Sequence, residues 1–216
     1  MAILSTKKLR GEKRKLVFDS GISLVEYNAI SIELISFKAP MVIENAIFTS
    51  QNAVLSIRES EIEIKNCFCV GEKTKSLLEK NGFNVIKMTE YASELAEFLV
   101  KNHQKDQFQF FCGNLRSEEI PLALKKNHIP FEEITVYITT LKPKQFEGQF
   151  DAILFYSPSG VQSFFEMNPS PNSDTLGICI GTTTASEAKK YMTNVEISNF
   201  TTIESVVEKA LELVAK

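Results

Sequence analysis

The sequence is poor in the residues that metal sites and many nucleophilic sites require. Its 216 residues include two histidines, four cysteines and no tryptophan. The cysteines form no C-x-x-C pair and no H-E-x-x-H motif is present, so we expect neither a zinc site nor a transition-metal site. His103 ends a helical pattern and His128 lies in a turn before Pro130, so we interpret both as exposed residues at helix ends. A Ser-His-Asp triad is therefore not expected.

The chain also has no excess of positive charge and no long apolar run. It has 24 Lys and Arg against 27 Asp and Glu, a net charge of −3, whereas a general nucleic-acid-binding protein usually carries a basic domain. No apolar run reaches the roughly 18 to 20 residues that a membrane helix needs, and residues 1–10 lack the apolar core of a secretory signal. We therefore expect a cytoplasmic protein. Its cysteines are then expected to be buried free thiols: Cys67, Cys69, Cys112 and Cys179.

Two segments of the chain resemble two later segments at nearly constant spacing. Residues 47–54 resemble 154–161, which lie 107 positions further on, and residues 69–74 resemble 179–184, which lie 110 positions further on. The three extra positions fall in the polar stretch 168–173, where a longer loop is tolerated. A chain of 216 residues can hold two domains of about 100 residues each. The spacing therefore indicates an internal duplication.

Each copy repeats one pattern, in which a short apolar run leads through a small or polar residue into an amphipathic helix. This alternation predicts the α/β class, with parallel sheets covered by helices on both faces. The piece that would complete the second copy lies at the N-terminus, whereas its counterpart ends the first copy. We therefore predict a first domain from residues 1–36 plus 142–216, a second from 37–141, and a two-stranded β linker near 26–37 and 133–141.

Polar loops follow five predicted strands, at the edge where open parallel sheets bind their ligands. Backbone N–H groups at a helix start favour an anion, although Ser and Thr at such positions also serve simply as helix caps. Five loops directed at one cleft between the domains would suit a ligand with several negative charges. The absence of G-x-x-x-x-G-K-[ST] and G-x-G-x-x-G motifs argues against a P-loop NTPase and a dinucleotide-binding dehydrogenase. The loops begin at Thr49, Gly71, Gly113, Ser157 and Gly181.

The basic run at residues 7–15 and Tyr137 each allow both a structural and a functional interpretation. Residues 7–15 hold six Lys and Arg, most of which we interpret as a solvated helix face. Arg10 alone is kept as a candidate, because a weak third repeat pairs it with Arg116. Tyr137 lies on the second predicted linker strand, where a tyrosine usually packs, but its hydroxyl is also a neutral proton donor at the wall of the predicted cleft.

Six short segments, taken in order, carry a resemblance to a known family. They are IFTS at 47–50 with Ala53 and Val54, VG at 70–71 with Thr74, FCGNLR at 111–116 with Pro121 and Leu124, ITVY at 134–137 with Thr139, FYSPSG at 155–160, and IGTTTA at 180–185. In this order they resemble the uroporphyrinogen-III synthase family. Residues 1–36 resemble that family mainly in their length and strand pattern. The resemblance implies two α/β domains joined by a two-stranded linker, with the first domain made from both termini.

The resemblance also implies a function. It implies a cyclising lyase of heme and tetrapyrrole biosynthesis that converts linear hydroxymethylbilane to uroporphyrinogen III, with loss of water and inversion of the last pyrrole ring. No metal or organic cofactor is implied. Tyr137 matches the family's proposed general acid. The implied substrate-binding residues are Thr49, Ser50, Gly71, Thr74, Asn114, Arg116, Ser157, Ser159, Gly160, Thr182 and Thr183.

Other interpretations of the same chain are a binding protein and a signalling module. A two-domain protein that closes on an anionic metabolite without chemistry would have the same architecture, and only the ordered motifs and Tyr137 favour the enzyme. A flavodoxin-like or response-regulator-like module is disfavoured, because its acidic phospho-acceptor cluster and aromatic flavin loops are lacking. We expect a monomer that acts on a small molecule, with the upstream hydroxymethylbilane synthase as its partner and no nucleic-acid or membrane partner.

Overall fold

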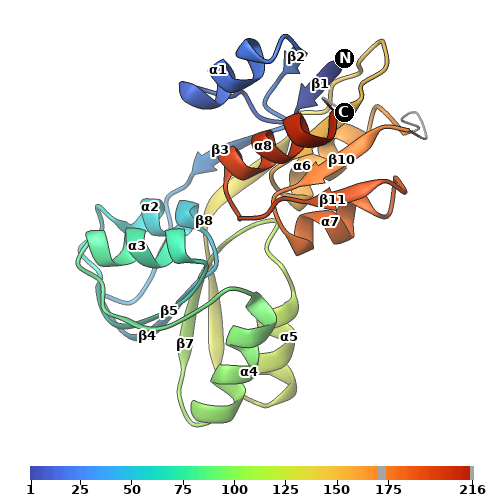
Figure 1. Ribbon diagram of the computed structural model, residues 1–216. Helices are drawn as coiled ribbons and strands as arrows, with labels where there is room; N and C mark the ends of the chain where they lie inside the picture. The colour runs from blue at the N-terminus through green and yellow to red at the C-terminus, as the bar shows by residue number, and fades with distance from the viewer. Residues whose placement is uncertain (170–173, 215–216) are drawn as a thin grey trace. The chain divides into compact units, whose positions relative to one another are not determined.

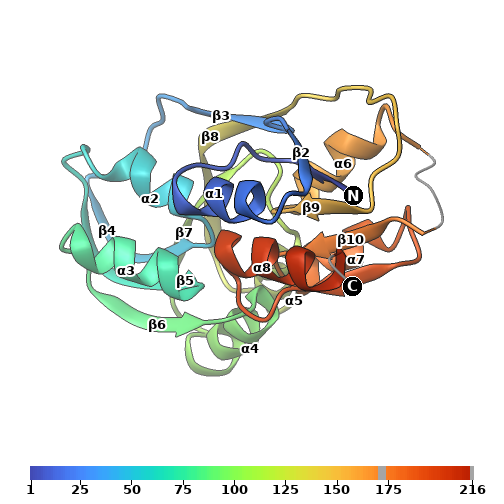
Figure 2. The ribbon, with the colours of Figure 1, turned by 45° about the horizontal axis from the view of Figure 1, so that its top comes forward.

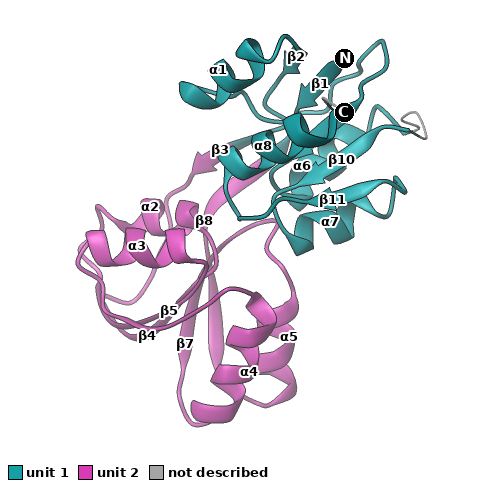
Figure 3. Cartoon of the chain, in the orientation of Figure 1, with its two compact units in different colours: residues 1–31, 140–216 teal, residues 32–139 magenta. Residues whose placement is uncertain are grey.

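The computed structural model describes residues 1–169 and 174–214 and contains two compact units (Figure 1). Unit 1 consists of residues 1–31 and 140–216, so both ends of the chain belong to it, and unit 2 consists of residues 32–139 (Figure 3). Residues 170–173 of the predicted polar loop lie outside the described residues. No helix in the described part of the chain is long and apolar enough to cross a membrane.

Unit 1 is built on a five-stranded parallel sheet in the order β11-β10-β9-β1-β2. All four residues of β9, AILF, are buried, as expected for a parallel strand with both faces covered. Along β1, Ile3 and Leu4 point to opposite faces and join different cores. The strands are β1 (Ala2–Ser5), β2 (Ser23–Glu26), β9 (Ala152–Phe155), β10 (Leu176–Cys179) and β11 (Val195–Ile197).

Helices cover both faces of this sheet. The core that contains Ile3 also contains Val17 of α1 (Glu12–Asp19) and Val206 of α8 (Ile203–Val214), and Figure 2 shows these two helices side by side. The core that contains Leu4 is formed with α6 (Pro158–Phe165) and α7 (Thr182–Ala188). The sheet is thus buried between two layers of helices, which leaves its carboxyl edge open for loops.

Unit 2 is built on a six-stranded sheet in the order β3-β8-β7-β4-β5-β6, in which the strands from β8 to β6 are parallel. The chain passes between the units within β3 and β8, and both strands are neighbours in this sheet. The separate two-stranded linker stays a prediction. The strands are β3 (Ile30–Leu34), β4 (Val42–Phe48), β5 (Glu63–Val70), β6 (Val85–Thr89), β7 (Phe108–Gly113) and β8 (Phe131–Leu141).

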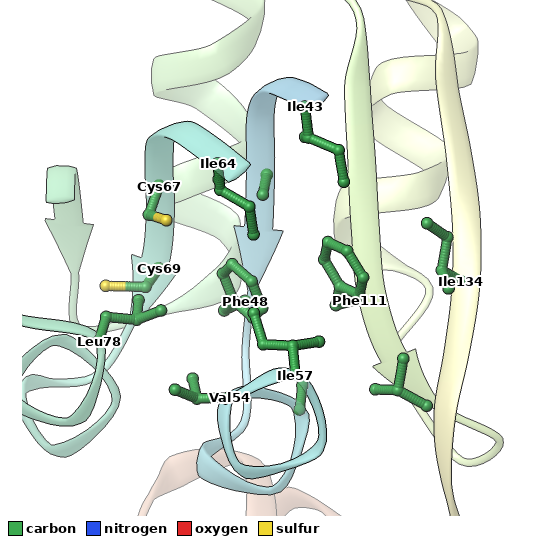
Figure 4. Packing of buried hydrophobic residues seen from close by; sticks show 13 residues of the cluster. Ile43, Phe48, Val54, Ile57, Ile64, Cys67, Cys69, Leu78, Phe111 and Ile134 are labelled. Carbon is green, nitrogen blue, oxygen red and sulfur yellow. The ribbon is translucent and has the colours of Figure 1, made fainter. Parts of the chain in front are cut away.

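Two cores lie on the two faces of the second sheet. One packs against α2 (Gln51–Ile57) and α3 (Glu72–Lys80), and Figure 4 shows it with Phe48 of β4 beside Phe111 of β7, whose rings are stacked at 5.2 Å. The other packs against α4 (Ala92–Asn102) and α5 (Glu119–Lys126). Together the two units confirm the predicted α/β class, with mostly parallel sheets between helices.

The four cysteines are buried and free, as predicted. Burial raises the pKa of Cys67, Cys69 and Cys179 to about 12 and that of Cys112 to about 11. Each thiol is therefore protonated near neutral pH and serves as a small apolar side chain.

The two histidines differ in exposure. His128 is exposed, as predicted, and lies at φ 56° in the turn directly after the C-cap of α5. His103 also ends a helix, α4, but the prediction that it is exposed is wrong. Its ring packs at 4.9 Å from that of Phe68, and its Nδ1 shares a hydrogen bond of 2.7 Å with Asp106. The apolar edge of the imidazole thus extends the core under α4.

Candidate functional site

Six predicted site residues of unit 2 lie together at the carboxyl edge of its sheet. β4, β5 and β7 are parallel neighbours, so the loops that follow them emerge at the same edge. Tyr137 of β8 faces this group, because its backbone is paired with Gly113 at the end of β7. The residues after the three strands are Thr49 and Ser50, Gly71 and Thr74, and Asn114 and Arg116.

Tyr137 lies directly over Gly113. A Cβ atom on Gly113 would overlap Cε2 and Cζ of the tyrosine ring and would lie 2.9 Å from its hydroxyl oxygen. Glycine is therefore required here because the ring approaches the backbone closely. The ladder between β7 and β8 shifts register at this point, which brings Tyr137 opposite the glycine.

The Tyr137 hydroxyl is hydrogen-bonded to Ser50 and is half-buried. Burial raises the pKa of Tyr137, and the hydrogen bond from Ser50 partly offsets this by stabilising the phenolate. Ser50 Oγ also accepts a hydrogen bond of 3.1 Å from the backbone N–H of Asn52 and so caps α2. The phenol is neutral near pH 7 and is held in place by a residue that the start of α2 fixes.

Gly71 and Thr74 shape the loop after β5. Gly71 has φ 85°, which disfavours any residue with a Cβ, and its N–H donates to the carbonyl of Thr89 at 2.8 Å. Thr74 is only 4% exposed and packs beneath the first turn of α3. The backbone of this loop is thus held from two sides, and Thr74 lies below it rather than at the surface.

Asn114 and Arg116 are engaged with partners in their own unit. The Asn114 side chain donates to the Thr139 carbonyl at 3.1 Å and accepts from the Thr139 N–H at 2.7 Å, which extends the pairing of β7 with β8. Arg116 donates two hydrogen bonds of 2.7 Å to the carboxylate of Glu133 and another to Glu118. These carboxylates raise the pKa of Arg116, which stays protonated, and their negative charges compensate its positive charge. The sequence-based prediction of a cation for ligand binding did not anticipate this pairing.

The predicted site residues of unit 1 lie at the carboxyl edge of the other sheet. Ser157 caps α6, because its Oγ accepts from the N–H of Gly160 at 3.1 Å, and it lies 3.1 Å from Ser159 Oγ. Thr182 and Thr183 are exposed in the first turn of α7. Each unit therefore carries its own group of candidate residues. In unit 1 they lie in the loops after β9 and β10, and in unit 2 they lie in the loops after β4, β5 and β7.

Sequence reasoning missed two residues beside the β9 loop. The Tyr156 hydroxyl lies 3.2 Å from Ser5 Oγ, and Ser5 Oγ donates to the carbonyl of Lys7 at 2.6 Å. Burial raises the pKa of Tyr156, so its hydroxyl stays protonated. The signal for Ser5 was available, since a polar residue directly after a buried apolar run is the same pattern that identified Ser50.

Within residues 1–169 and 174–214, no group of three or more His, Cys, Asp or Glu side chains could hold a metal ion.

Comparisons with known proteins were made for sequence and for fold. The family model described as uroporphyrinogen-III synthase HemD matches residues 14–208. A uroporphyrinogen-III synthase from Chlorobaculum parvum is 28% identical over 82% of this chain and 83% of its own length. A porphyrin biosynthesis protein HemD from Ruminiclostridium josui is 31% identical over 46% of this chain, which spans about a fifth, 21%, of that longer protein.

Two solved structures share the fold over nearly the whole chain. The uroporphyrinogen-III synthetase from Helicobacter pylori has a TM-score of 0.68 at 19% identity and covers 98% of this chain and 99% of its own. A mutant uroporphyrinogen III synthase from Thermus thermophilus has a TM-score of 0.72 at 11% identity and covers 100% and 99%. At these identities the likeness concerns the fold.

Proposed function

This chain belongs to the uroporphyrinogen-III synthase family, and on that premise we propose how its residues carry out the family's reaction. The reaction closes the linear tetrapyrrole hydroxymethylbilane to uroporphyrinogen III, with loss of water and inversion of the last pyrrole ring. The protein is a cyclising lyase of tetrapyrrole and heme biosynthesis. A binding protein without chemistry is not favoured.

The enzyme has to control where the ring closes. Hydroxymethylbilane closes readily without an enzyme at the free carbon of the last pyrrole and then gives the type I isomer. The enzyme has to direct closure to the substituted carbon instead, so holding the flexible substrate in one conformation decides the product. The many acetate and propionate carboxylates of the substrate are the groups by which it can be held.

Tyr137 is proposed as the general acid, and its arrangement with Gly113 and Ser50 is the observation that carries this assignment. The ring is positioned by close contact with the Gly113 backbone, and the hydroxyl is bonded to Ser50. The raised pKa keeps the phenol protonated, so it can donate its proton to the departing hydroxyl, which leaves as water. The hydrogen bond from Ser50 stabilises the phenolate that remains.

The loops of both units are proposed to hold the substrate carboxylates through hydroxyls and backbone N–H groups. Thr74 and Arg116 are proposed to support these loops, because Thr74 is buried and Arg116 is paired with Glu133. The upstream hydroxymethylbilane synthase is the proposed partner, since it releases the unstable substrate. The proposed contacts are Thr49, Ser50, Gly71 and Asn114 in unit 2, and Ser157, Ser159, Gly160, Thr182 and Thr183 in unit 1.

A coupled assay tests the function. Hydroxymethylbilane is generated in place, and the products are oxidised to porphyrins and separated into the type I and type III isomers. The protein is expected to convert most of the substrate to type III. If the isomer ratio equals that of the spontaneous reaction, the synthase function is refuted.

A further inference from the structure

The loop between β1 and α1, residues 6–11, has a fixed backbone. Thr6 donates from its N–H and its Oγ1 to the carbonyl of Leu154, at 3.1 and 2.6 Å. The Lys7 carbonyl accepts from Ser5 Oγ at 2.6 Å, and the N–H of Lys8 donates to Asn28 Oδ1 at 3.1 Å. Leu9 is buried in the core under α1 and α8. The loop is therefore anchored at four successive residues.

The charged side chains of the same loop are exposed and unpaired. Among the described residues, no ion pair or side-chain hydrogen bond involves the cationic groups of Lys7, Lys8 or Arg10. The next cations along the chain differ, because Lys13 pairs with Glu204 and Arg14 pairs with Glu26. The interpretation of most of this basic run as a solvated helix face is therefore wrong for Lys7 and Lys8, which precede α1. Arg10, which was kept as a candidate, also precedes that helix.

Few carboxylates are available to neutralise this loop. Glu12 is the only acidic residue among the first 18, against six Lys and Arg. Glu26, the acid on the neighbouring strand, is already held by Arg14 at 2.9 Å. The cations therefore keep their full attraction for an anion from solution.

The loop also lies at the edge that carries the candidate residues of unit 1. β1 and β9 are parallel neighbours, so residues 6–11 and the Ser157 loop leave the sheet at the same edge. The two loops are in contact range, because a Cβ on Gly160 would lie 3.6 Å from Thr6 Oγ1.

We infer that Lys7 and Lys8, with Arg10, bind carboxylates of the tetrapyrrole substrate and supply the positive charge that the paired Arg116 does not. This inference rests on the proposed function and extends it to a loop outside the family motifs. Because the backbone of this loop is already fixed, binding has to order only the side chains and not the loop itself, and the cations supply attraction for the carboxylates.

The double variant Lys7→Gln/Lys8→Gln tests the inference. We expect KM for hydroxymethylbilane to rise by about 5- to 30-fold, from two exposed charge-assisted contacts, with kcat within about twofold of the wild type, since neither lysine takes part in the chemistry. The difference should shrink as salt rises from about 0.1 M to about 1 M, because the Debye length falls from about 10 Å to about 3 Å. Lys7→Arg/Lys8→Arg should restore the wild-type KM.

The matched control is Lys125→Gln/Lys126→Gln in the last turn of α5, where two exposed lysines lie away from the carboxyl edge. It removes the same charge and should leave KM within about twofold. An unchanged KM in the Lys7/Lys8 variant, or an equal rise in the control, would overturn the inference.

Binding of uroporphyrin III, a stable octacarboxylate, provides a readout that does not depend on turnover. Its Kd should rise in the Lys7/Lys8 variant by a factor similar to that of KM, and an unchanged Kd would overturn the inference. If the wild type forms only the type I isomer, the proposed function fails, and the uroporphyrin Kd still decides whether this loop binds anionic tetrapyrroles.

Discussion

Replacing Gly113 with alanine is expected to displace Tyr137 and remove most of the activity. The added Cβ would overlap two ring carbons and lie 2.9 Å from the phenolic oxygen. Carbon atoms pack at about 3.5–4.0 Å, so the ring has to move by about 1 Å. Overpacking of this kind costs about 1–3 kcal/mol of stability. A misplacement of about 1 Å can lower the rate by about 100-fold.

A double-mutant cycle with Tyr137→Ala separates the steric effect from other consequences of the added methyl group. The urea-unfolding free energy should fall by about 1–3 kcal/mol when Gly113→Ala is made in the wild type. In the Tyr137→Ala background it should fall by no more than about 0.5 kcal/mol, because the overlapping ring is gone. Formation of the type III isomer is measured in parallel. Equal costs in both backgrounds, or an alanine variant with more than half of the wild-type rate, would refute the idea that this contact positions the phenol.

Tyr137→Phe keeps the ring but removes the phenolic proton, so kcat should fall by about 10- to 100-fold at constant KM, and full activity of this variant would exclude an acid role. Because burial raises the pKa of Tyr137, the kcat of the wild type should not fall between about pH 7 and 9. Gly71→Ala imposes φ 85° on an L-residue and should lower the free energy of unfolding by about 1–3 kcal/mol in a thermal melt. The control Gly181→Ala, in extended backbone, should change this free energy by less than about 1 kcal/mol. Equal losses of stability in the two variants would contradict the explanation by the positive φ of Gly71. The four cysteines, with pKa values raised to about 11 or 12, should react with a thiol reagent at about pH 8 only after unfolding, and reaction of the native protein would show that one is accessible.

The fold class and the location of the candidate loops could be predicted because burial leaves a direct trace in the sequence. All six residues of β7, FQFFCG, are buried, so the strand is an apolar run interrupted only by Gln109, and Asn114 follows directly after its last residue, Gly113. Where such a run is followed by a small or polar residue and then a helix, the loop has to lie at the carboxyl edge. The pattern therefore identifies the loops at the carboxyl edge of a sheet even when the order of the strands in that sheet is not known.

The partners of side chains could not be predicted, because they come from distant parts of the chain. Arg116 was predicted as a ligand-binding cation, but Glu133 reaches it from the neighbouring strand. The contact between Ser5 and Tyr156 joins residues 151 positions apart. His103 was predicted to be exposed because helix ends usually are, yet the imidazole finds both an aromatic neighbour and a carboxylate.

The assignment of both chain ends to unit 1 has a consequence for synthesis on the ribosome. Every strand of the unit 2 sheet lies between Ile30 and Leu141, so all of its strands are synthesised before β9. β1 is an inner strand of unit 1 and pairs with β9, about 150 residues later. At about 5–20 residues per second, β1 therefore waits roughly 7 to 30 s for its partner. During that interval its apolar residues and open edge are available to chaperones, and all the strands of unit 2 are synthesised between the two parts of unit 1.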